Sequence, residues 1–175
     1  YEDNMRGDVS RVWSGKLPAT VEDKIISNCK AQAEYMKNYV YGWQSRPTIE
    51  KSKKKGTCVT YVACVLQRTG LLPAGKYIWH DEKGKVVGAT KDMTVIYCSK
   101  TLKEYKNRLE KGDIVITGSK SDTAGGSHIF IVTGKWNGNN PYIWDNHSAE
   151  RIKAGKSGAH TYNGNKKVIA IVKAR

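Results

Sequence analysis

The chain has 175 residues, 39% of them hydrophobic, which is enough for one domain with a single substantial core. Its many tyrosines and tryptophans exclude an intrinsically disordered chain, and no apolar run is long enough to span a membrane or to form a signal-peptide core. The formal net charge of +14 predicts attraction to polyanions, but no zinc-finger spacing, RNP-like motif or basic heptad helix accompanies the lysines. We therefore expect no specific nucleic-acid partner.

Residues 1–19 are polar and patternless, and we expect them to form an N-terminal arm ahead of a single domain at residues 20–175. A first helix is predicted from an N-cap at Thr20 to about Trp43, because apolar residues recur at helical spacing over this range. Residues 44–56, which contain a proline and four lysines, are expected to form a solvated loop.

A second helix is predicted to begin at Cys58 and to run to Thr69. Thr57 is a typical N-cap, and Gly70 followed by Pro73 should end the helix. The first turn of a helix offers unpaired N–H groups and a partial positive charge, which is the environment that a reactive thiol needs. Cys58 is therefore a candidate nucleophile.

The other three cysteines have different surroundings. Cys29 and Cys64 lie among apolar residues of the predicted helices and are expected to be buried, inert thiols, whereas Cys98 is undecided. The spacing of the cysteines does not match a zinc site or a disulfide framework. We expect neither a metal nor an organic cofactor.

The second half of the chain has strand character. A hairpin is predicted around residues 76–87, and a short helix at residues 100–109. Helices followed by an antiparallel sheet predict an α+β fold with helices packed on the sheet. The expected strands cover residues 113–117, 128–133, 142–145 and 168–173.

A histidine and several polar residues lie at the ends of these strands. His128 opens the most apolar strand, which would place its ring at the rim of the sheet, and a cysteine with a histidine is the minimum equipment for nucleophilic acyl transfer. Strand alternation would place Asp145 and His147 on one face of the next strand, with Asn146 on the other. Asp145 is the preferred partner of His128, because a carboxylate also stabilises an imidazolium. Asn146 and His147 remain alternative partners of the imidazole.

Several short motifs occur in an order that resembles the NlpC/P60 family of papain-like cysteine peptidases. More broadly, the order resembles the CHAP amidases of bacterial wall hydrolases and phage endolysins. Thr57 stands where the family has an aspartate, and residues 74–100 have no counterpart in the family pattern. The matching segments are Tyr39-Val-Tyr-Gly42-Trp43, Thr57-Cys58-Val59-Thr60, Arg68-Thr-Gly70-Leu71-Leu72-Pro73, Lys111-Gly112-Asp113-Ile114-Val115 and Gly126-Ser-His128-Ile129, within residues 22–148.

The resemblance implies a papain-like NlpC/P60 fold at residues 20–175 and assigns roles to four residues. Cys58 would attack a peptide carbonyl, His128 would take its proton, and Asp145 would orient the imidazole. Backbone N–H groups at the helix start would hold the oxyanion, and Tyr39 would line the substrate groove.

The activity implied is hydrolysis of peptide or amide bonds in bacterial peptidoglycan, by an endopeptidase or an amidase. The partner would be peptidoglycan or another anionic cell-wall polymer, and the protein would be a monomer without a membrane span. It would be secreted, associated with the cell wall, or encoded by a phage and released at lysis. Two alternatives stay open: a papain-like hydrolase, deamidase or transferase acting on a non-wall protein, and a non-catalytic basic binding module.

Overall fold

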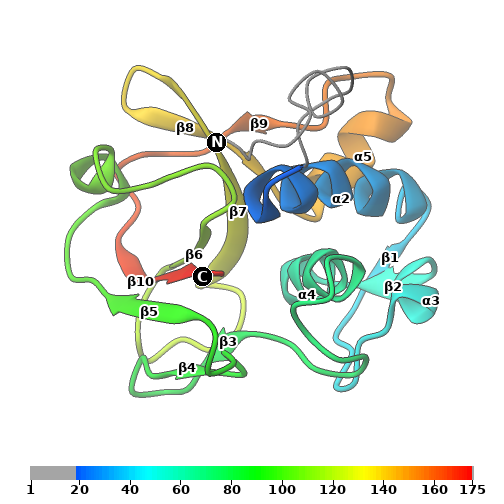
Figure 1. The fold of residues 1–175 in the computed structure, drawn as a ribbon, viewed down its shortest axis with the longest axis horizontal. Helices are drawn as coiled ribbons and strands as arrows, with labels where there is room; N and C mark the ends of the chain where they lie inside the picture. The colour runs from blue at the N-terminus through cyan, green and yellow to red at the C-terminus, as the bar shows by residue number, and fades with distance from the viewer. Residues whose placement is uncertain (1–18, 175) are drawn as a thin grey trace, which may run out of the picture.

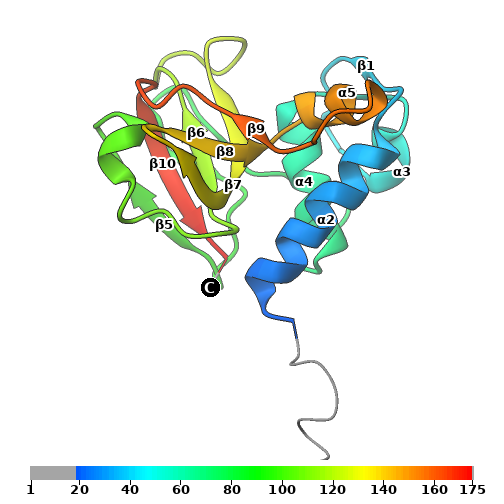
Figure 2. The same ribbon diagram turned by 90° about the horizontal axis from the view of Figure 1, so that it is seen from above.

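The computed structural model describes residues 19–174 and shows a mixed α+β fold. Figures 1 and 2 show a curved antiparallel sheet beside a group of helices, with the last strand in the interior of the sheet. Within the described residues, no helix has the length and apolar character required to cross a bilayer. The arm expected at residues 1–19 lies outside this range except for its last residue.

The helices form the layer that carries the candidate nucleophile. Helix α4 packs against both α2 and β7, and all of its residues from Cys58 to Leu66 are buried. The helical segments of the described chain are α2 (Val21–Tyr35), α3 (Ile49–Ser52), α4 (Cys58–Arg68), the 3-10 helix η1 (Leu102–Tyr105) and α5 (His147–Lys153).

The sheet has six strands in the order β5-β10-β6-β7-β8-β9, and all neighbours are antiparallel. Two small pairs lie outside it: β1 with β2 in parallel, and β3 with β4 in antiparallel orientation. The bounds are β1 (Val40–Tyr41), β2 (Lys55–Gly56), β3 (Trp79–His80), β4 (Val86–Val87), β5 (Thr94–Tyr97), β6 (Ile114–Thr117), β7 (His128–Asn137), β8 (Asn140–Trp144), β9 (His160–Thr161) and β10 (Val168–Lys173).

Side-chain alternation along β7 divides the core between the two faces of the sheet. Ile129 and Ile131 pack in a cluster with residues of α2 and α4, whereas Phe130 and Val132 pack in a second cluster with Leu102 of η1. The apolar residues of β7 therefore fix the strand between two cores and hold its first residue at the rim of the sheet.

The α+β class with an antiparallel sheet is confirmed, and so is the second helix, which ends at Arg68 rather than at Thr69. The hairpin near residues 76–87 is present as β3 and β4, with shorter strands. The expected strands at 113–117, 142–145 and 168–173 correspond to β6, β8 and β10 within two residues, and 128–133 is the first part of the longer β7.

The first helix was predicted to reach Trp43, and this was wrong. It ends at Tyr35, and Met36 is its C-cap. The apolar helical pattern stops at Met36, and the β-branched and aromatic pair Val40–Tyr41 instead forms a strand beside Lys55–Gly56. This pairing brings β1 next to the start of α4.

Two other predicted segments differ in detail. The loop expected at residues 44–56 contains α3, whose N-cap Thr48 accepts a hydrogen bond from the backbone N–H of Lys51. The helix expected at residues 100–109 is limited to the four-residue η1, because the chain turns away after it.

The strand predicted at residues 142–145 was expected to continue the alternation of side chains between its two faces as far as His147. It ends at Trp144 instead, and α5 begins at His147. The N–H of Asp145 donates to Ser148 Oγ at 3.1 Å, and the N–H of Ser148 donates to the Asp145 carbonyl at 3.0 Å. These two bonds close a turn, so Asp145 and His147 do not share a strand face.

Thr57 fixes the start of α4 with a capping box. Its Oγ1 accepts from the Val59 N–H at 3.2 Å, and its own N–H donates to Thr60 Oγ1 at 3.0 Å. We expect Thr57→Ala to lower the free energy of unfolding by about 1–2 kcal/mol, measured by urea denaturation. Thr57→Ser is the control and should retain most of the stability; an equal loss in both variants would contradict the role of the hydroxyl.

Candidate active site

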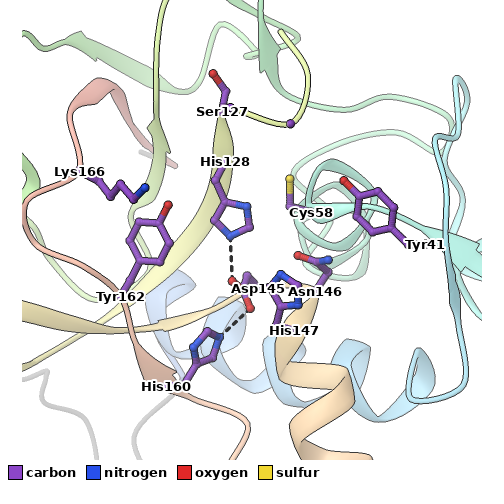
Figure 3. Close-up of a pocket in the computed structure, with 12 residues that line it drawn as sticks. Tyr41, Cys58, Ser127, His128, Asp145, Asn146, His147, His160, Tyr162 and Lys166 are labelled. Carbon is purple, nitrogen blue, oxygen red and sulfur yellow. Dashed lines mark hydrogen bonds and ion pairs between the residues drawn. The ribbon is translucent and has the colours of Figure 1, made fainter. Parts of the chain in front are cut away.

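A cavity of about 370 Å³ lies between the start of α4 and the sheet. Figure 3 shows that its labelled side chains come from β1, from α4, from the start of β7 and from the segments that follow β8. We call it the catalytic cavity; its side chains include Tyr41, Cys58, His128, Asp145, Asn146, His147, His160, Tyr162 and Lys166.

Cys58 is the first residue of α4, and its side chain faces the catalytic cavity. Figure 3 shows the sulfur on the side of the His128 ring. Interaction with Cys58 is among the effects that raise the pKa of His128. The thiol and the imidazole, 70 positions apart in the sequence, therefore line the same cavity and interact.

His128 is held by the carboxylate of Asp145. Its Nε2 donates to Asp145 Oδ2 at 2.8 Å, which leaves Nδ1 as the ring nitrogen that can exchange a proton with Cys58. Burial opposes the charged ring, but the hydrogen bond to Asp145 and the interaction with Cys58 outweigh it and raise the pKa of His128 to about 9. The ring is therefore an imidazolium at neutral pH.

Asp145 is almost completely buried, and both of its oxygens are used. Oδ1 accepts from Nε2 of His160 at 2.7 Å, in addition to the bond from His128 to Oδ2 (Figure 3). Burial alone would raise the pKa of the carboxyl group, but the two histidines lower it well below its usual range. The carboxylate stays charged and its orientation is fixed from two sides.

His160 was not among the predicted site residues. It lies in the two-residue strand β9, after a segment rich in glycine, serine and lysine that has no periodic pattern. Tyr162, two residues later, stacks on the ring of His128 with a centroid distance of 5.5 Å. The only sequence signal at this position is a histidine and a tyrosine on the same side of a short extended segment.

The two other candidates for the orienting residue lie elsewhere. Asn146 is buried, and its Nδ2 donates to the Tyr39 hydroxyl at 3.0 Å. His147 is exposed; its ring centroid is 6.2 Å from that of His128, and its Nδ1 lies 3.5 Å from Glu150 Oε2. Asp145 is thus the one of the three that bonds to His128.

The predicted groove residue, Tyr39, does not line the catalytic cavity, whereas Tyr41 does. The Tyr39 hydroxyl donates to Glu150 Oε1 at 2.9 Å and so ties the segment after α2 to α5. Figure 3 shows the hydroxyl of Tyr41 turned toward Cys58. Burial and the charge of Cys58 raise the pKa of Tyr41, which keeps the phenol protonated as a hydrogen-bond donor.

The remaining cysteines do not line the catalytic cavity. Cys29, Cys64 and Cys98 are free and buried. Burial raises the pKa of Cys64 to about 11, and it raises the pKa values of Cys29 and Cys98 as well. The two helix cysteines are thus unreactive packing residues, as predicted, and Cys98 joins them.

Within residues 19–174, no group of three histidine, cysteine or acidic residues is arranged to hold a metal ion. The two histidines and Asp145 satisfy one another instead, because each imidazole Nε2 donates to its own carboxylate oxygen. No family model, no curated protein and no solved structure matches this chain. The site consists of a thiol at a helix start, an imidazole beside it and a buried carboxylate behind the imidazole.

Proposed function

We propose that the chain is a papain-like cysteine hydrolase that cleaves peptide or amide bonds in bacterial peptidoglycan. The observation that carries the proposal is the order of the three groups: Cys58 at the helix start, His128 beside it, and the buried Asp145 bonded to the far nitrogen of the ring. A nucleophile, a base and a group that orients the base are the parts of a catalytic triad.

In the proposed reaction, Nδ1 of His128 already holds the proton of Cys58 in the resting imidazolium, and the sulfur attacks the substrate carbonyl carbon to form a C–S bond as the carbonyl π electrons move to the oxygen. The imidazolium then gives this proton to the leaving nitrogen as the C–N bond breaks, and an amine departs. A water molecule attacks the thioester while His128 takes one of its protons. Breaking the C–S bond releases a carboxylic acid and leaves the sulfur beside the His128 imidazolium, as at the start of the reaction.

The negative oxygen that forms during attack needs hydrogen-bond donors near the sulfur. The N–H of Cys58 lies in the first turn of α4, where backbone donors have no partner within the helix. The Tyr41 hydroxyl lies on the same side of the cavity and supplies a second donor. We assign this role to Tyr41; Tyr39, which was expected to line the substrate groove, bonds to Glu150 instead.

Tyr41→Phe is expected to lower kcat by roughly 10- to 100-fold, because it removes one donor to the developing oxyanion and keeps the ring. Steady-state kinetics on a soluble muropeptide measures the effect. Tyr39→Phe is the matched control, since among the described residues this hydroxyl bonds to Glu150 and Asn146; its kcat should stay within about threefold of wild type. A larger loss in Tyr39→Phe than in Tyr41→Phe would reverse the assignment.

A cell-wall substrate is supported by the charge of the chain and by its motif order. A net charge of +14 attracts the chain to anionic wall polymers, which raises the local concentration of enzyme at its substrate. The NlpC/P60-like motifs supply the substrate class, whereas the charge alone suits any polyanion.

Digestion of purified peptidoglycan tests the proposal. Wild type should release soluble fragments that mass spectrometry identifies, and Cys58→Ala should release none. Equal release by both proteins, or no release by wild type from walls of several chemotypes, would overturn it.

A further inference from the structure

A second cavity, of about 570 Å³, shares Cys58 and Tyr41 with the catalytic cavity but is not lined by His128. Its volume is in the range of small-molecule binding sites. We call it the aromatic groove, because four aromatic side chains line it: Tyr41, Trp43, Tyr77 and Trp79.

The aromatic groove is firmly built but open. Trp43 stands edge-on to Tyr77 with a centroid distance of 5.4 Å, and Trp79 Nε1 donates to the carbonyl of Thr123 at 3.0 Å. Trp79 is buried, whereas Trp43 is 48% exposed and Tyr41 is 66% exposed. A large, half-exposed ring such as Trp43, held against Tyr77 beside Cys58, forms a prepared surface for part of a substrate.

The chemistry of the aromatic groove is uncharged. No acidic residue, lysine, arginine or histidine lines it. Its aliphatic side chains are those of Val59 and Ala124. Aromatic faces carry partial negative charge and suit the polarised C–H groups on the flat face of a sugar ring, while the tyrosine hydroxyls suit its polar groups. A pocket for an aliphatic peptide side chain would present more branched aliphatic residues than these two.

The catalytic cavity has the opposite character. Lys166 and His147 line it, and its single carboxylate, Asp145, already accepts from two histidines. A substrate carboxylate is therefore favoured on this side.

The position of His128 gives the orientation of the substrate. Its imidazolium must protonate the leaving nitrogen, so the amine part of the substrate lies in the catalytic cavity and the acyl part extends into the aromatic groove.

We infer, on the basis of the proposed function, that the scissile bond is the amide between the amino sugar and the stem peptide, which makes the chain an amidase. The lactyl carbonyl of an uncharged N-acetylmuramoyl ring would form the thioester with Cys58, and the carboxylate-bearing peptide would leave as the amine after protonation by His128. An endopeptidase acting within the stem would instead place a peptide carboxylate in a groove without a cation. Tyr77 and Trp79 belong to residues 74–100, the segment without a counterpart in the family pattern.

Two soluble substrates with the same scissile amide test this inference: N-acetylmuramoyl-L-alanyl-D-isoglutamine and the D-lactoyl dipeptide that lacks the sugar ring. Wild type should cleave both at the lactyl–alanine bond and prefer the first. Trp43→Ala should lower kcat/KM for the sugar substrate by roughly tenfold and leave the lactoyl peptide within about twofold. Trp43→Phe should retain most of the preference, and Trp136→Ala, on the distal part of β7, should not change it.

Three results would overturn the inference. The first is equal cleavage of both substrates by wild type. The second is an equal loss of kcat/KM for both substrates in Trp43→Ala, which would indicate an apolar peptide site or a structural effect. The third is wall fragments cut inside the stem peptide. In each of these cases wall digestion that depends on Cys58 would continue, so the proposed function would stand. Failure of wild type to cleave either substrate or any wall would reject both.

Discussion

Substitution of His128 with alanine is expected to reduce kcat/KM by roughly 10⁴-fold or more on a soluble muropeptide. In the proposed reaction, His128 holds the proton of Cys58 and passes it to the leaving nitrogen, so its loss removes both functions. His128→Asn should be almost as inactive, although its amide can still donate to Asp145. Steady-state kinetics, with circular dichroism to verify folding, measures the effect.

The chain supplies a matched control for this variant. His147 lines the same cavity but is exposed and has Glu150 as its polar partner. His147→Ala should keep kcat/KM within about fivefold of wild type, the remaining effect being weaker attraction of the substrate carboxylate. If both alanine variants were equally inactive, the two histidines could not have the different roles that their contacts indicate.

The sequence predicted the parts of the site that lie on strongly patterned elements. Thr57 and Gly70 mark the ends of α4, and the apolar run after His128 marks β7. A cap, a helix stop and an uninterrupted apolar strand are local signals, and tertiary contacts did not override them. Cys58 and His128 could therefore be placed at the starts of their elements from the sequence alone.

The parts that the sequence did not predict depend on contacts between distant segments. His160 is held beside Asp145 by the pairing of β9 with β8, and a two-residue strand has no periodicity to detect. Tyr41 replaces Tyr39 at the cavity because β1 pairs with β2, a parallel contact over two residues that local propensity does not indicate. The turn at Asp145 depends on a hydrogen bond to the side chain of Ser148. A serine at this position is equally compatible with the end of a strand, so the sequence did not indicate the turn.

Asp145→Asn is expected to lower kcat/KM by roughly 10²- to 10⁴-fold near neutral pH and to move the alkaline limb of the pH profile. The pKa of His128 is raised to about 9 in the folded protein, so the wild-type imidazolium and its activity should be lost as the pH rises through about 9. Without the negative charge of Asp145, the pKa of His128 falls, and the decline should begin at least about one pH unit earlier. An alkaline limb unchanged in Asp145→Asn would show that the carboxylate does not support the imidazolium.

Variants of His160 separate the charge of Asp145 from its orientation. His160→Ala leaves Oδ1 of a buried carboxylate without its donor, so the carboxylate can turn away from His128 and kcat should fall by roughly tenfold. His160→Gln offers an N–H at a similar reach and should restore most of this loss, which an effect on general stability would not explain. Because His160 touches Asp145 rather than the reacting atoms, KM should change little in either variant, and a rise in KM with unchanged kcat would place His160 in substrate binding instead.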